Sequence, residues 1–421
     1  MKKNFFKRSI AAALTAAMVF SNSYMTAFAD ENDTVAGAEQ TVTVSSGTTS
    51  RESNFNNGWK FYLGDNSSAS GANFDDSSWD DVSLPHDFSI GREFTASGEA
   101  ESGFLPGGTG WYRKTFVLPE SYEGKTLVIN FDGVYSDAYV YVNGTQMGEN
   151  HYGYTSFAFD ISDYVTCDGS TENVIAVKAV NNIPSSRWYS GSGIYRDVTL
   201  IATDPVHVER YGTKVTTPDI ASGTGTVSTE VTVKNDSNTA ANVTVRNTVY
   251  TSDGTQASNF AETSVTVNAG ATATATSEPV VSKPELWSTD SPTMYYVSTE
   301  LLVDGSVVDT YDTEFGFRYF SFDSDTGFYL NGEAVKLNGV CMHHDQGALG
   351  SAAAYDAMYR QLAKMKDMGV NAIRTSHNPA DEDFIDICNE LGLLVMEEAF
   401  DGWSVSKMAT AMTSASISTP A

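Results

Sequence analysis

The chain has 421 residues, and 53 acidic residues against 25 lysines and arginines give it a formal net charge of −28 at pH 7. This length permits two or three domains with a sizeable core. The acidic charge argues against a polyanionic partner such as nucleic acid. Cys167, Cys341 and Cys388 are far apart and odd in number, so they form no disulfide framework. We expect all three to be buried as small apolar side chains.

The first 29 residues have the pattern of a cleavable export signal. Lysines and an arginine precede a short apolar run at 10–20, and Ala27-Phe28-Ala29 offers a cleavage site after Ala29. The apolar run is too short to span a bilayer, and no other stretch reaches that length. The mature protein is therefore expected to be secreted or periplasmic. Residues 30–53 are rich in Ser, Thr, Glu and Gly, which predicts a flexible linker.

Two β regions of different composition follow. In 54–203, candidate strands at 127–132, 138–142 and 174–180 alternate in polarity, and Asn143-Gly144 is a strong hairpin signal. Short strands with Gly and Asn turns predict a jelly-roll sandwich. In 205–317 the strand spacing and the Asp304-Gly305 turn suit an immunoglobulin-like sandwich without a cysteine pair.

After residue 318, strands alternate with helices. Strands are predicted at 335–342, 370–374 and 393–397, with helices at 356–368 and 380–391 between them. This order predicts a parallel sheet, and no G-x-G-x-x-G follows the first strand, which disfavours a dinucleotide fold. The predicted fold class is therefore multidomain β plus α/β: a jelly roll, an immunoglobulin-like sandwich and the first three units of a (β/α)8 barrel. Three strands cannot close a barrel.

Polar side chains follow each of the three strands. They are His343, His344 and Asp345, then Arg374, Ser376 and His377, then Glu397, Glu398 and Asp401. In a (β/α)8 barrel these strand ends carry the active site. His343, His344 and Asp345 could ligate a metal by residue type. Adjacent histidines at a strand end seldom reach one ion, however, and no third ligand has clear spacing. We predict no metal site and favour a sugar pocket, with a plain polar loop as the alternative.

The stretch N-A-I-R-T-S-H-N-P at 371–379 resembles the signature of glycoside hydrolase family two. That family contains β-galactosidases, β-glucuronidases and β-mannosidases, and its signature has Tyr where this chain has Asn378. Further segments resemble the family's jelly roll, middle sandwich and barrel start, so the similarity covers roughly 54–403. Those segments are 79–87, 110–113, 186–198, 286–295, 315–318, 330–332 and 337–345.

The resemblance implies retaining hydrolysis by two carboxyl groups about 5 to 5.5 Å apart. The family's acid/base glutamate follows the fourth barrel strand, and its nucleophile lies several strands later. Neither position exists in this chain. Glu397 and Glu398 are neighbours that point to opposite sides, so they cannot both face one glycosidic bond. We therefore expect no catalytic residue here and no activity of this chain alone.

What remains by resemblance is substrate binding. His377 would contact sugar hydroxyls, Arg374 would orient the nucleophile, and Arg187 and Trp188 would reach the barrel mouth from a jelly-roll loop. The predicted substrate-binding residues are His343, His344, Asp345, Arg374, His377, Arg187, Trp188, Glu398 and Trp403. Structural roles stay open: a salt bridge for Arg374, and core packing for His377 and Trp403. His86 and Asp87 are expected to be structural.

The large β-galactosidases of the family bind magnesium just after the third strand, but this chain lacks the histidine there. No cofactor is therefore predicted. Residues 404–421 are atypical for a barrel, and two interpretations stay open: an unstructured tail or a shifted reading frame.

The predicted function is an exported family-two glycosidase, with β-galactosidase favoured. β-Glucuronidase, β-mannosidase, a non-catalytic carbohydrate-binding protein and a structural protein are the alternatives. A carbohydrate is the expected partner, and homo-oligomers stay open.

Overall fold

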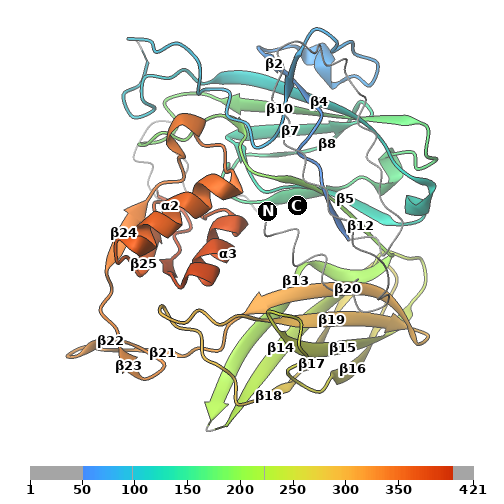
Figure 1. Cartoon of the computed structure of the whole chain (residues 1–421). Helices are drawn as coiled ribbons and strands as arrows, with labels where there is room; N and C mark the ends of the chain where they lie inside the picture. The colour runs from blue at the N-terminus through green and yellow to red at the C-terminus, as the bar shows by residue number, and fades with distance from the viewer. Residues whose placement is uncertain (1–50, 97, 222, 402–421) are drawn as a thin grey trace, which may run out of the picture. The chain divides into compact units, whose positions relative to one another are not determined.

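The computed structural model describes residues 51–96, 98–221 and 223–401 (Figure 1). The predicted signal segment, most of the predicted linker, the atypical tail and Trp403 lie outside these residues. The linker prediction was wrong at its end, because Glu52–Asn54 forms strand β1, which pairs with β12 (Val198–Thr203). No helix within the described ranges has the length and apolar character needed to cross a membrane.

The first domain has two main antiparallel sheets, as the alternating pattern predicted. One has the order β1-β12-β5-β9 and the other β3-β2-β4-β10-β7-β8, while β6 and β11 form a separate pair. Their buried faces share one core, in which Trp59, Phe131 and Val177 are fully enclosed. The strand bounds are β2 Trp59–Leu63, β3 Asp80–Val82, β4 Gly108–Val117, β5 Thr126–Phe131, β6 Val134–Tyr135, β7 Asp137–Val142, β8 Thr145–Asn150, β9 Phe157–Asp160, β10 Glu172–Asn181 and β11 Gly193–Ile194.

The second domain is a sandwich of two further antiparallel sheets. The first has the order β13-β14-β17 with β18 beside β14, and the second β16-β15-β19-β20. Val233, Val245 and Leu301 fill the space between them, and Asp304-Gly305 joins β19 to β20 as predicted. The bounds are β13 Val206–Ala221, β14 Thr224–Asn235, β15 Ala241–Thr251, β16 Ala261–Val267, β17 Ala271–Ser277, β18 Val280–Ser282, β19 Tyr295–Val303 and β20 Ser306–Phe315.

The third region contains the predicted parallel sheet, in the order β24-β25-β26. The predicted first strand at 335–342 was too long at its start, because parallel pairing begins only at Gly339. The Val335 amide still bonds to the Phe328 carbonyl at 3.0 Å, next to the hairpin of β22 and β23. The bounds are β21 Phe320–Asp323, β22 Gly327–Leu330, β23 Glu333–Ala334, β24 Gly339–Met342, α2 Tyr355–Asp367, β25 Ala372–Thr375, α3 Glu382–Leu391 and β26 Leu394–Met396.

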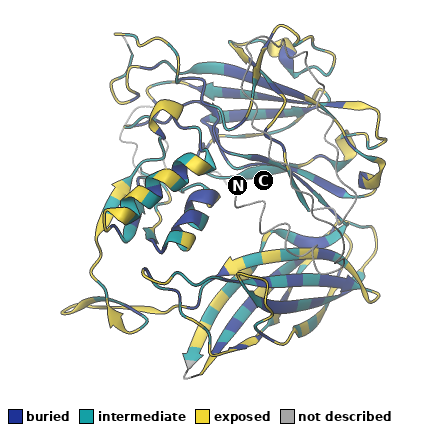
Figure 2. Ribbon diagram, in the orientation of Figure 1, coloured by how far each residue is buried: buried dark blue, intermediate teal, exposed yellow. Residues whose placement is uncertain are grey.

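One face of this sheet is buried by its two helices, and the other is open among the described residues (Figure 2). Leu362, Ile387 and Cys388 pack against Ile373 at the helix-covered face. Val340 joins this cluster, so its neighbour Cys341 points to the opposite face and is exposed. The prediction of three buried cysteines was therefore wrong, since Cys388 alone is buried and Cys167 is half-buried.

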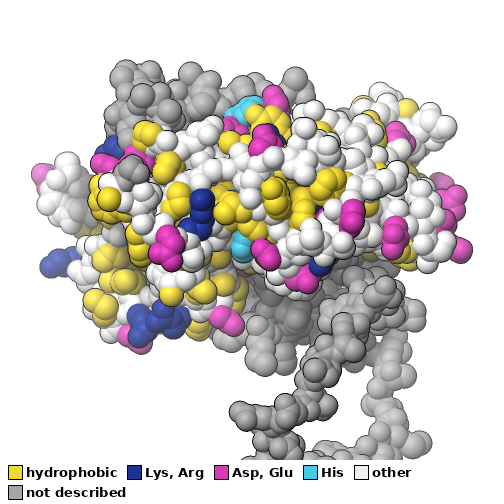
Figure 3. Space-filling model, turned by 90° about the horizontal axis from the view of Figure 1, so that it is seen from above, with side chains coloured by type: hydrophobic (Ala, Val, Ile, Leu, Met, Phe, Trp, Pro, Cys, Tyr) yellow, Lys and Arg dark blue, Asp and Glu magenta, His cyan; other side chains and the backbone are white. Residues whose placement is uncertain are grey.

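On the face seen from above, the acidic side chains of the described residues do not form one patch (Figure 3). Seen from above, carboxylate side chains are scattered over the visible face among apolar and neutral ones (Figure 3). Several are paired, as in the exposed Lys214–Glu230 and Arg246–Glu262 contacts across strands.

Candidate functional site

The ends of β25 and β26 bring three predicted residues into one hydrogen-bonded group. The Glu398 carboxylate receives Arg374 Nε at 2.7 Å and Arg374 Nη2 at 2.6 Å on Oε1, and its Oε2 lies 2.9 Å from His377 Nδ1. The Glu398 amide donates to Thr375 Oγ1 at 3.0 Å. Adjacent parallel strands place the residues after them at one edge of the sheet, which is why this group forms.

Glu397 points elsewhere, as its alternation with Glu398 predicted. Its Oε1 accepts a hydrogen bond from the Ala380 amide at 2.7 Å, at the turn before α3. The two neighbouring carboxylates therefore have different partners and do not face a common point.

Trp188, from the jelly roll, packs against two histidines of the barrel strands. Its ring centroid lies 5.2 Å from that of His343 and 5.4 Å from that of His377, and the two histidine rings lie 5.5 Å apart. The indole Nε1 donates to Tyr154 Oη at 3.1 Å, which holds the ring plane in place. The structure thus joins residues that are far apart in the sequence into one aromatic cluster.

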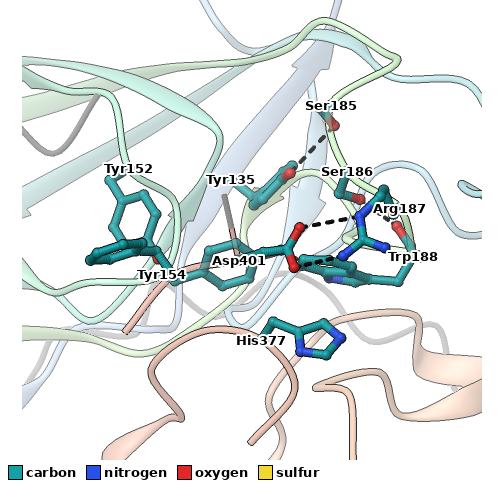
Figure 4. Close-up of a pocket in the computed structure, with 10 residues that line it drawn as sticks. Tyr135, Tyr152, Tyr154, Ser185, Ser186, Arg187, Trp188, His377 and Asp401 are labelled. Carbon is teal, nitrogen blue, oxygen red and sulfur yellow. Dashed lines mark hydrogen bonds and ion pairs between the residues drawn. The ribbon is translucent and has the colours of Figure 1, made fainter. Parts of the chain in front are cut away.

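Arg187 forms a bidentate ion pair with Asp401, beyond β26. Nη2 lies 2.6 Å from Oδ1, and Nε lies 3.1 Å from Oδ2. The pair lines a pocket with about 360 Å³ of empty space, open to solvent (Figure 4). The other lining residues are Tyr135, Tyr152, Tyr154, Ser185, Ser186, Trp188, His377 and Phe400.

Several lining residues were missing from the predicted set, notably Asp401, Tyr152 and Tyr154. Asp401 was recognised only as a polar residue after the third strand. Tyr152 donates to the Ala399 carbonyl at 2.6 Å, so it joins the jelly roll to the end of β26. No local pattern in the segment His151-Tyr-Gly-Tyr154 signals that its tyrosines face the barrel strands, because that contact depends on domain packing.

His344 and Asp345, like His343, Arg374 and Glu398, are not among the residues that line this pocket. His344 Nε2 lies 3.2 Å from the Ser190 carbonyl, and its ring packs against Tyr154 and Tyr195 with centroids 5.4 Å and 5.5 Å away. This burial lowers the pKa of His344 to about 3, so the ring is neutral at ordinary pH. A sugar contact for either residue stays a prediction, as does one for Trp403, which lies outside the described residues.

Asn378, the departure from the family signature, faces away from the pocket. Its side chain is almost fully buried, its Oδ1 accepts from the His377 amide at 3.2 Å and its Nδ2 donates to the Pro379 carbonyl at 3.3 Å. The side chain therefore stabilises its own turn.

The residues after β26 do not suit a magnesium ion. Both Asp401 oxygens are engaged by the Arg187 guanidinium, a cation that would repel the metal. Across the part of the chain that the structure describes, no group of three or more His, Cys, Asp or Glu side chains is placed to hold a metal ion.

The described chain thus has two sandwich domains followed by parallel βα units, with an aromatic and charged pocket at the strand ends. Models of glycosyl hydrolases family 2 match the chain in three consecutive parts: the sugar binding domain at 100–205, the second domain at 206–318 and the TIM barrel domain at 324–420. The last match includes most of the atypical tail.

Curated relatives and solved structures agree with these matches. Beta-galactosidase BoGH2A from Bacteroides ovatus is 42% identical over 362 residues, which are 85% of this chain and 42% of that protein. A putative beta-glucuronidase from Formosa agariphila is 40% identical over 355 residues, 84% of this chain and 33% of that one. A family 2 member from Bacteroides cellulosilyticus superposes with a TM-score of 0.83 at 37% identity, covering 86% of this chain and 47% of that structure.

The chain belongs to glycosyl hydrolase family 2. It spans less than half the length of these three relatives.

Proposed function

We propose that this chain forms the sugar-binding part of an exported, retaining β-galactosidase. The observation that carries the proposal is the pocket in which Trp188, His377 and the Arg187–Asp401 pair meet. An indole ring packs well against the C–H face of a sugar. The Asp401 carboxylate and the His377 ring supply polar atoms for its hydroxyl groups. The export signal predicted at the N-terminus supports action on a carbohydrate outside the cell.

The charges of the pocket favour a neutral sugar over a uronic acid. A sugar carboxylate is best bound by a guanidinium that is free to form paired hydrogen bonds. Here Arg187 is occupied by Asp401. Arg374 does not line the pocket, and it is occupied by Glu398, which contacts the lining residue His377. A glucuronide would bring a third negative charge beside those two carboxylates. The 42% identity to a β-galactosidase points the same way, whereas the 40% identity to a putative β-glucuronidase makes glucuronides the necessary comparison.

We further infer that the 421-residue chain binds sugar without hydrolysing it. Retaining hydrolysis needs a carboxyl pair about 5 to 5.5 Å apart on either side of one bond. Glu397 is engaged at the turn before α3, and Glu398 is held by Arg374 and His377. Within residues 51–96, 98–221 and 223–401, the strand-end carboxylates that we recognise therefore serve as structural or binding groups.

The experiment combines a hydrolysis panel with a binding titration. Aryl β-galactoside, β-glucuronide, β-mannoside and β-glucoside are incubated with the chain, and methyl β-galactoside and methyl β-glucuronide are titrated by calorimetry. We expect no turnover, preferential binding of the galactoside, and at least a tenfold loss of affinity in Trp188→Ala, with most of it retained in Trp188→Phe. Turnover would refute the inactivity, preference for the glucuronide would refute the sugar, and absence of any binding would refute the sugar-binding role.

A further inference from the structure

Asp87, which follows β3 in the jelly roll, is a buried carboxylate with five neutral donors. Oδ1 accepts from the amides of Ser89 and Ser192, both at 2.9 Å. Oδ2 accepts from Tyr189 Oη at 2.6 Å, and from the amide and hydroxyl of Ser351 at 2.9 Å and 3.2 Å. Its side chain is enclosed, with the residue only 3% exposed. A buried charge persists only when hydrogen bonds replace its lost hydration, and here they come from two domains.

The Ser89 amide lies in the same turn as Asp87, and the other four donors belong to two loops that lie side by side. Tyr189 and Ser192 are in the jelly-roll loop at 187–195, which carries Trp188. Ser351 ends the loop at 343–351, which begins with His343. A further hydrogen bond joins these loops, because His344 Nε2 lies 3.2 Å from the Ser190 carbonyl. Just beyond the second loop, the Ala353 amide donates to the Tyr195 carbonyl at 2.9 Å.

The loops approach so closely that glycine is required at two positions around Asp87. Gly350 has a φ of 62°, and a Cβ atom there would lie 2.2 Å from Asp87 Oδ2. Gly191 has a φ of 67°, and its Cβ would lie 1.8 Å from Ser351 Oγ. Contacts this short cannot be accommodated without moving one loop away from the other.

We propose that Asp87 is a positioning residue for the sugar pocket. It fastens the jelly-roll loop to the first barrel loop, and thereby sets the Trp188 ring against His343 and His377. Asp87 itself touches no sugar and acts through these two loops. The inference rests on the proposed sugar-binding function for its effect on affinity, whereas the joining of the loops can be tested without any sugar.

The first test is Asp87→Asn, with Asp309→Asn as the matched control. An asparagine amide keeps the size of the side chain but replaces one acceptor oxygen by a donor, which cannot receive an N–H group. Asp309 is also buried and accepts the Val208 amide, but it lies in β20 of the second domain and has a charged partner, because Arg51 Nη1 is 2.7 Å from its Oδ2. In Asp87→Asn we expect the Ser351 and Ser192 amides to exchange hydrogen at least tenfold faster, a shift of Trp188 fluorescence, and at least a tenfold loss of galactoside affinity. The control should change none of these.

A second pair of variants keeps the test decisive if Asp87→Asn fails to fold. Gly350→Ala and Gly347→Ala both place a side chain at a φ of 62°, but no atom lies within 4 Å of the Cβ position at Gly347. We expect Gly350→Ala alone to reproduce the faster exchange and weaker binding. Unchanged exchange at Ser351 in both Asp87→Asn and Gly350→Ala would overturn the proposal. If the wild-type chain binds no galactoside, the proposed function fails, and the exchange rates still decide the role of Asp87.

Discussion

At the scale of single residues, histidines of the same chain have opposite electrostatic environments. Burial lowers the pKa of His344, and the hydrogen bond to the Ser190 carbonyl offsets this only in part. Burial also lowers the pKa of His151, but hydrogen bonds to Asp137 and Glu149 outweigh it, so the net shift is upward. Neutral His344 can pack between two tyrosine rings, whereas His151 is best bound when protonated.

These shifts predict opposite effects of pH on stability. Unfolded histidine takes up a proton near pH 6.5, but folded His344 does so only at about 3. The free energy of unfolding therefore decreases as the pH falls from about 6.5 to about 3, because the unfolded chain binds the proton and folded His344 does not. The decrease is at most about 1.4 kcal/mol per pH unit. Because the pKa of His151 is raised in the folded chain, its protonated ring adds to the free energy of unfolding at low pH. This stabilisation is lost as the pH rises past the pKa of His151 in the folded chain.

Urea unfolding at pH 4, 5, 6 and 7 checks this prediction in His344→Gln and His151→Gln. The free energy of unfolding of His344→Gln should fall less steeply than that of the wild type below pH 6.5. His151→Gln should lose stability mainly at the acidic end. The pKa values of His86 and His207 are also lowered, but both histidines are present in the variant and in the wild type. The difference in the free energy of unfolding between the two proteins therefore reports on His344. Parallel pH profiles for wild type and His344→Gln would contradict the assignment.

At the scale of elements, α3 shows how local sequence signals and tertiary contacts act together. Asp381 caps its N-terminus by accepting from the Asp383 amide at 2.9 Å, and Gly392 ends it with a φ of 70°. Both are local signals, and the helix ends at Leu391, as predicted. The second domain also meets this helix end, because Trp287 Nε1 donates to the Asn389 carbonyl at 2.9 Å.

Gly392 is therefore expected to be more sensitive to substitution than Gly369, the glycine that follows α2. Both have positive φ, but a Cβ at Gly392 would lie 2.5 Å from the Thr289 carbonyl oxygen, whereas nothing lies within 4 Å at Gly369. Gly369→Ala should cost about 1 kcal/mol from backbone strain alone. Gly392→Ala should cost roughly 2 to 3 kcal/mol, because overpacking adds to the strain. Equal unfolding midpoints for the two variants would show that the contact with Thr289 is unimportant.

At the scale of the whole molecule, stability is expected to be uneven. Strand β10 has a hydrogen-bonded neighbour on each side, and its apolar side chains are enclosed in the jelly roll. In the described residues, β24 and β26 each pair with β25 only, and Met396 is 64% exposed. The face covered by α2 and α3 is well packed. Weak protection of backbone amides against hydrogen exchange should therefore be confined to the outer strands and to the hairpin β21–β23.

Native-state hydrogen exchange resolved by residue measures this difference. The amides of β10 should exchange most slowly within their sheet. The amides of β25 that bond to β24 should exchange most slowly within theirs. Amides of β21 and β26 should exchange at least a hundredfold faster than those of β10, a difference of about 2.7 kcal/mol in opening free energy at 25 °C. Uniformly strong protection after residue 318 would contradict this expectation.

The sequence by itself determined the local structure and the family. Alternating and helical periods placed most strands and both helices, and strand order alone predicted that polar residues after β25 and β26 would meet. The first barrel strand was predicted to begin at residue 335, but its parallel pairing with β25 begins only at Gly339. Local polarity also could not show that Cys341 lies on an open sheet face.

Only the tertiary structure decided how the pocket is assembled. Arg187 meets Asp401 across 214 residues, and Asp87 meets Ser351 across 264. Such contacts depend on how whole domains pack, and they leave no periodic trace in the segments that form them. Asp87 could be recognised from sequence as structural, but the two loops that it joins become visible only when the jelly roll and the first barrel strands are folded together.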